Sequence, residues 1–133
     1  MKNMKTIGII SLLLLVVSVR AQYVPFKVKL NIMERFVVQS LLPKETNYAT
    51  HKIINDLRTQ LAPTEEELAK INLRATPDGG STADWDAVPE KEFVFGEISE
   101  GMIKGALEDL DKKGKLLQEH LSVYEKFIKR ESK

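Results

Sequence analysis

Apolar residues recur at helical spacing near both ends of the chain. Apolar side chains repeat close to every 3.6 positions up to Pro43, which predicts a helix at about 29–42. The same spacing predicts a second helix at about 47–61, for which Thr46 and Asn47 are both suitable N-cap residues. The residues that carry these two patterns are Leu30, Met33, Phe36, Val37, Leu41, Ile53, Ile54, Leu57 and Leu61.

A capping motif follows the second helix. Thr64 precedes Glu67 by three positions, a spacing that lets each side chain bond the other residue's backbone N–H. Glu65 and Glu66 lie where the positive end of a helix dipole favours acids. We therefore expect a short third helix at about 65–71.

The last third of the chain returns to helical spacing. One apolar stripe predicts a helix at about 97–113 that ends at Gly114, and a second stripe predicts a helix at about 116–130. The short connection implies an antiparallel helical hairpin that shares one core with the first two helices. The residues expected to be among the most buried are Ile53, Leu57, Ile103, Leu107, Leu121 and Tyr124.

The middle of the chain has a different composition. Residues 74–89 are rich in Gly, Pro, Asp and Ser, and Pro77–Gly80 is a turn signal. This pattern predicts a short hairpin between residues 72–76 and 81–86. Residues 92–96 favour a strand, because they combine aromatic and β-branched side chains.

Together these patterns predict a mainly α protein, a small bundle of four to five helices with a short β-hairpin or loop insert at about 72–96. The alternative for the insert is a mobile loop, which its length favours. We expect one domain at residues 22–133, because the chain shows no internal repeat and no low-complexity tract.

The first residues have the three parts of a secretory signal. Lys2 and Lys5 form a basic head, and residues 6–19 carry no charge. Val19 and Ala21 place modest or small side chains at the first and third positions of the triplet before a cleavage point. The uncharged run is shorter than the roughly 20 residues of a membrane-spanning helix. We predict a cleavable signal peptide at 1–21 and export to the periplasm or out of the cell. The alternatives are an uncleaved anchor and a buried first helix.

Charge and cysteine content narrow the function classes. Removing the predicted signal takes away three basic residues and no acid, so the net charge changes from +1 to −2. A nucleic-acid partner is therefore not expected, since such binders need a concentrated basic surface. The absence of cysteine excludes disulfides and thiolate-bound zinc, so the hydrophobic core alone must hold the domain together.

Two long segments carry a resemblance to other proteins. These are LNIMERFVVQSLLPKETNYATHKIINDLRTQL at residues 30–61 and FGEISEGMIKGALEDLDKKGKLLQEHLSVYEKFI at residues 95–128. Together they resemble small, uncharacterised helical proteins of bacterial and prophage type. The resemblance implies a helical fold but no activity. The predicted signal peptide is a departure from that group.

Candidate chemistry is sparse. His51 and His120 each lie alone in a predicted helix without the partner of an HExxH metal site, so we interpret both as surface or boundary residues. Asp78, Asp84 and Asp86 form the densest acidic cluster, but their spacing differs from that of an EF-hand. A solvated turn is the prediction, with a bound cation as the alternative. No catalytic residue, cofactor or metal ligand is identified.

The only tryptophan, Trp85, lies between Asp84 and Asp86. It either fixes the loop to the core or stands exposed as an anchor for a partner, since tryptophan is enriched at binding hot spots. On the second interpretation these three residues form the candidate partner-binding site.

The favoured function is a non-catalytic exported binding or interaction module that contacts another protein through residues 74–89. The sequence offers no nucleophile paired with a general base that would suggest catalysis. No stable membrane span is expected to remain after cleavage of the signal. The alternative is a small carboxylate-dependent hydrolase or metal-dependent enzyme, with Glu92, Glu97 and Glu100 as candidate acids. Ordinary acids at a helix start also explain these three residues.

Overall fold

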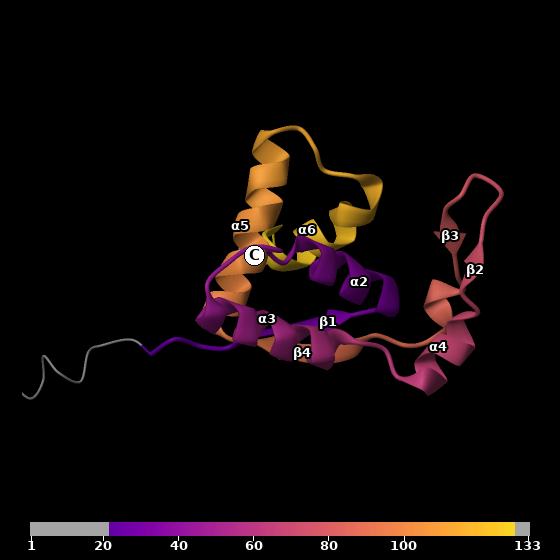
Figure 1. The fold of residues 1–133 in the computed structure, drawn as a ribbon, viewed down its shortest axis with the longest axis horizontal. Coiled ribbons are helices and arrows are strands. Elements are labelled where there is room, and N and C mark those ends of the chain that lie inside the picture. Colours follow the sequence, from indigo (N-terminus) through magenta and orange to yellow (C-terminus); the bar gives the residue numbers. More distant parts are fainter. Residues whose placement is uncertain (1–21, 130–133) are drawn as a thin grey trace, which may run out of the picture.

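The computed structural model describes residues 22–129, and the predicted signal peptide at 1–21 lies outside this range. Five α-helices and two small antiparallel sheets make up the described chain (Figure 1), which confirms the mainly α class. The helices are α2 (Ile32–Leu41), α3 (Tyr48–Leu61), α4 (Glu65–Ile71), α5 (Glu97–Lys112) and α6 (Leu121–Phe127), with short 3-10 helices η1 (Trp85–Ala87) and η2 (Gln118–His120). The strands are β1 (Phe26–Leu30), β2 (Arg74–Ala75), β3 (Ser81–Thr82) and β4 (Lys91–Phe95).

The start of the first predicted helix is wrong, because residues 26–30 form strand β1. Asn31 separates strand from helix: its side chain accepts the backbone N–H of Glu34 at 2.8 Å, and the Glu34 carboxylate accepts that of Asn31 at 3.0 Å. Strand β1 pairs antiparallel with β4, with Val28 opposite Phe93. The predicted strand at 92–96 is thus present, but its partner comes from the opposite end of the domain.

The main core lies against one face of the β1–β4 sheet. Alternate strand residues point inward, as the two-residue period of a strand requires. Phe127 of α6 stacks on Phe26 at 5.1 Å and meets Phe95 edge-to-face at 5.5 Å between ring centroids. The fully buried members of this core are Leu30, Val38, Ile54, Leu61, Phe95, Ile103, Leu107, Val123 and Phe127.

The last apolar stripe is confirmed only in part. The predicted continuous helix at 116–130 is instead η2 followed by α6. Phe127 of the stripe is fully buried, and Tyr124 and Ile128 pack against the core, but Leu117 is 57 % exposed. Leu121 is 42 % exposed, whereas Val123 and Phe127 are buried. Among the other predicted core residues, Leu57, Ile103 and Leu107 are buried, and Ile53 and Tyr124 are partly buried.

Residues 65–88 form an arm that stands out from the rest of the molecule, which we call the body (Figure 1). The arm contains α4, the β2–β3 hairpin and η1. The hairpin confirms the predicted pairing, with Ala75 opposite Ser81 and the turn closed by Gly79 at a φ of 88°. A second buried cluster holds the arm to α2 and consists of Ile32, Ile71, Ala83 and Val88, with Trp85 packed against it.

Candidate functional site

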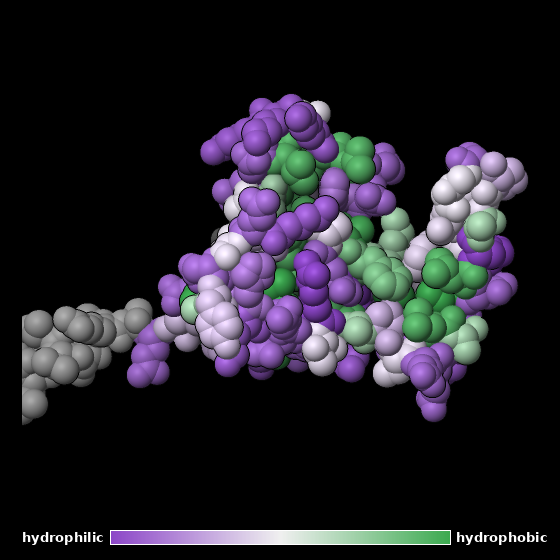
Figure 2. All heavy atoms as spheres, viewed as in Figure 1, coloured by the Kyte–Doolittle hydropathy of each residue, from purple (hydrophilic) through white to green (hydrophobic). Residues whose placement is uncertain are grey.

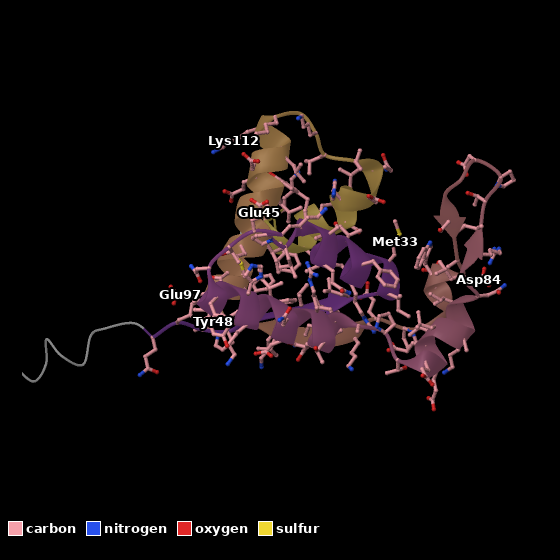
Figure 3. The ribbon with its side chains drawn as sticks, in the orientation of Figure 1. Met33, Glu45, Tyr48, Asp84, Glu97 and Lys112 are labelled. Atoms are coloured by element: carbon pink, nitrogen blue, oxygen red, sulfur yellow. The ribbon has the colours of Figure 1, made fainter. Side chains whose placement is uncertain are left out.

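Trp85 lies at the base of the arm, where η1 places its ring beside α2. The ring meets Phe36 edge-to-face, with 6.3 Å between centroids and 75° between planes. It is partly buried against the second cluster, so it contributes to fixing the arm while part of the ring stays accessible. Met33 lies one helical turn before Phe36 and projects from the same end of α2 (Figure 3).

Other apolar side chains of the arm are open to solvent. Leu68 on α4 is 39 % exposed, and Leu73, just after α4, is 52 % exposed. Figure 2 shows apolar atoms gathered over α4 and the base of the hairpin. We call Leu68, Leu73 and Trp85, together with Phe36 of α2, the arm surface.

The acids of the insert lie apart and have local roles. Asp84 is exposed and forms a 3.4 Å ion pair with Arg74, and such surface pairs contribute little stability. Asp86 is exposed in η1. Asp78 closes the hairpin turn: its carboxylate accepts the Thr76 hydroxyl and the Gly80 N–H, which hold the pKa of Asp78 below its usual value. In residues 22–129 no three His, Asp or Glu side chains are grouped to hold a metal ion.

The acids considered for an enzyme are also separated. Glu92 lies near the start of β4, whereas Glu97 and Glu100 follow the other end of that strand. Glu100 accepts the hydroxyl of Tyr23, which raises the pKa of Tyr23 to about 12, and it pairs with Lys104 at 2.9 Å. Burial alone raises the pKa of Glu100, but these two hydrogen bonds outweigh it and leave the pKa lowered.

The two histidines differ in their surroundings. His51 is half-buried on α3. His120 is buried, which corrects its interpretation as a surface or boundary residue. Its Nδ1 accepts the backbone N–H of Leu117 at 2.8 Å and so closes the η2 turn.

A buried ion pair joins the arm to the body. Arg35 of α2 is 1 % exposed and donates two hydrogen bonds to the Glu67 carboxylate of α4, at 3.1 and 2.9 Å. Its guanidinium carbon also lies 5.1 Å from the ring centroid of Phe93. Chiefly through the hydrogen bonds from Arg35, the pKa of Glu67 falls to about 2.

The body contains a groove of about 570 Å³ between β1 and α6. The groove is lined by Lys27, Val28 and Lys29 of β1, Glu90 and Glu92 at the start of β4, and Glu125, Lys126 and Lys129 from the end of the chain. Sequence reasoning did not identify this groove, because its walls come from opposite ends of the domain.

Lys126 connects the walls of the groove. Its ammonium lies 2.8 Å from each of three oxygens: the Glu34 carboxylate, the Glu90 carboxylate and the Lys29 carbonyl. Glu34 is only 2 % exposed, so Lys126 compensates a buried charge. Burial alone lowers the pKa of Lys126, but the two carboxylates outweigh it and raise that pKa.

Comparison of the chain with family models, curated proteins and solved structures gives no match. No helix within residues 22–129 combines the length and apolar character needed to cross a membrane. The arm surface and the groove are two candidate interaction sites among the described residues.

Proposed function

We propose that the chain is an exported, non-catalytic binding module that contacts another protein through its arm. The proposal rests above all on the arm surface. Leu68 and Leu73 are exposed, and the Phe36–Trp85 pair at the base of the arm is incompletely buried. Exposed apolar side chains that gather on one part of a small protein are typical of an interaction site, and tryptophan is a frequent anchor.

The way the arm is held supports the same proposal. The Arg35–Glu67 ion pair and the Thr64–Glu67 capping box fix α4, and the Asp84 N–H bonds the Ile71 carbonyl at 2.6 Å to fix the hairpin base. A surface that is ordered before binding loses less conformational entropy when a partner docks. The arm thus offers an apolar contact surface on a constrained support.

Export remains part of the proposal, on the strength of residues 1–21. Their basic head, uncharged run and small residue at position 21 are typical of a cleaved signal. We expect the protein recovered from the producing cell to begin at Gln22. An intact-mass measurement checks this, and a soluble cytoplasmic form that retains residues 1–21 would contradict it.

The enzyme alternative receives less support. Its candidate acids lie at two ends of β4, and Glu100 is already engaged by Tyr23 and Lys104. Acid–base catalysis requires groups that converge on one reacting atom. The separation of these acids favours the binding module.

Photo-crosslinking tests the binding module in the producing cell. A photoreactive amino acid at position 73 is expected to yield a discrete crosslinked protein, and the Leu68→Asp substitution is expected to remove that product. The matched control places the same group at position 48 on α3, where Tyr48 is 78 % exposed and belongs to the body. The same products from both positions, or none from position 73, would refute an arm-mediated contact.

A further inference from the structure

A small hollow lies where the loop between α2 and α3 meets one side of α3. Its volume is about 140 Å³, and its lining consists of Pro43, Lys44, His51, Ile54, Asn55 and Arg58. We propose that this hollow binds a phosphate group through its four nitrogen-bearing side chains, those of Lys44, His51, Asn55 and Arg58. The site belongs to the body and does not depend on the arm surface.

The spacing of the lining residues on α3 places them on one side of the helix. His51, Asn55 and Arg58 are separated by four and by three positions, the intervals at which side chains of a helix are neighbours. Lys44 reaches the same hollow from the loop that follows α2. Two separate segments of the chain thus contribute donors to one space.

The lining of the hollow carries positive charge and no acid. Lys44 and Arg58 are cationic, and His51 adds a third positive charge when it is protonated. The acids nearest in sequence lie elsewhere. Glu45 is not part of the lining, and Asp56 is about 200° around α3 from Arg58. The hollow therefore favours an anion.

The donors of the hollow are not engaged by other parts of the protein. Among residues 22–129, no hydrogen bond or ion pair involves the side chains of Lys44, His51, Asn55 or Arg58. Lys126 in the groove differs, because its ammonium already contacts three oxygens. An anion can therefore enter the hollow without breaking an existing contact.

Size and charge select the ligand. The hollow of about 140 Å³ has roughly five times the ~30 Å³ that one water molecule occupies in the liquid, which accommodates a phosphate group but not a whole nucleotide. A phosphate group carries a charge of about −1.5 to −2 at neutral pH, close to the opposite charge of Lys44 and Arg58 together. The planar guanidinium of arginine also matches a pair of phosphate oxygens. A carboxylate has a single charge and leaves donors unused.

The donors are held on a constrained support. The Asn47 side chain accepts the Thr50 N–H at 2.9 Å and so fixes the start of α3. Ile54 and Leu57 anchor the same helix in the main core. Pro43 restricts the backbone just before Lys44. A site that is ordered before binding loses less conformational entropy when the ligand enters.

NMR titration with inorganic phosphate tests the proposal on the chain as recovered from the producing cell. We expect saturable shifts of amide signals within residues 43–58, with a millimolar Kd. Sodium chloride at the same ionic strength should not cause them, and acetate should bind more weakly than phosphate. Absence of saturable shifts with phosphate, or binding of acetate as tight as that of phosphate, overturns the proposal.

Vesicles distinguish two sources of the phosphate group, because Lys44, Asn55 and Arg58 are exposed and the hollow is open to a phosphate group on a larger molecule. The probes are phosphatidylcholine vesicles with and without phosphatidic acid. Sedimentation only with phosphatidic acid, reversed by free phosphate, assigns a lipid headgroup to the hollow. Phosphate binding without sedimentation assigns free phosphate or a soluble phosphate ester.

Protein variants locate the binding. Lys44→Gln removes a charge that lines the hollow and should raise the phosphate Kd by about tenfold, as expected for the loss of one charge-assisted hydrogen bond. Lys52→Gln is the matched control. Lys52 is also exposed, but it lies outside the lining and over the ring of Tyr48. This variant should change the Kd by less than about twofold, since salt screens a charge that makes no contact.

Arg58→Gln should weaken phosphate by a factor similar to that of Lys44→Gln. Equal effects of the two lysine variants indicate nonspecific charge attraction and overturn the site. Crosslinking at position 73 is unaffected by either result, so this proposal and the arm-mediated contact fail separately.

Discussion

The body and the arm are stabilised in different ways. Fourteen buried hydrophobic residues form the core of the body, but only four form the second cluster, and one of these, Ile32, belongs to α2. The arm therefore lacks a core of its own and depends on α2 through this cluster, the Arg35–Glu67 pair and the Phe36–Trp85 contact. Regions with few buried contacts open at lower free energy than the core. We infer that the arm opens before the body unfolds.

The largest effect is expected in the body core. Phe127→Ala removes a fully buried ring that contacts Phe26 and Phe95, and should lower the free energy of unfolding by about 3–5 kcal/mol. Leu121→Ala on the same helix is the control and should cost less than about 1 kcal/mol, because Leu121 is already 42 % exposed. Chemical denaturation measures both. Equal losses would mean that the faces of α6 are wrongly assigned.

The next largest effect is expected from the Arg35–Glu67 ion pair that joins the arm to the body. Glu67→Gln leaves the guanidinium of Arg35 buried without its carboxylate, which should cost about 3 kcal/mol. The arm should then open far more often than the body. Limited trypsin digestion detects this as faster cleavage at the exposed Arg74, while Glu66→Gln, one residue earlier in α4, should match the wild type. Unchanged cleavage of the Glu67→Gln variant would show that the Arg35–Glu67 ion pair does not hold the arm to the body.

A smaller effect is expected from the aromatic contact at the base of the arm. Trp85→Ala should lower stability by about 1–2 kcal/mol, less than the loss for a fully buried ring, because the ring is only partly buried. In the wild type, Trp85 emission should be partly accessible to a soluble quencher. Emission that resists quenching completely would show that the ring only fixes the arm and is no anchor.

The last effect is a response of the arm to acid. The pKa of Glu67 is about 2 in the folded protein against an ordinary value of 4.5, so its stabilising contribution is complete above the ordinary value and is lost as pH falls toward 2. Trp85 emission should therefore shift to longer wavelength between about pH 4.5 and pH 2. Glu67→Gln should lack this transition. An identical acid transition in the variant would assign it to other carboxylates.

Local signals in the sequence predicted much of the fold. The capping box at Thr64 and Glu67 defined α4, and the turn at Pro77–Gly80 defined the hairpin. Strand β1 was missed because Leu30 fits both a helical and an alternating pattern, and the pairing with β4 is nonlocal. The Asn31–Glu34 capping box was a readable signal for the true helix start.

The candidate site was less accessible to sequence reasoning. Trp85 was singled out by its type and its loop, but its contact with Phe36 depends on how the arm folds back onto α2. The groove and the bonds of Lys126 join residues from distant parts of the chain, and only tertiary structure brings them together. No periodicity or motif carries that information.

Native-state hydrogen exchange, read residue by residue by NMR, tests the contrast between arm and body most directly. We expect the protected amides of α4 and the β2–β3 hairpin to share an opening free energy clearly below that of α5 and the β1–β4 sheet, and Glu67→Gln to lower the arm value further. Equal opening free energies for the two regions, with arm and body exchanging only through global unfolding, would contradict this expectation.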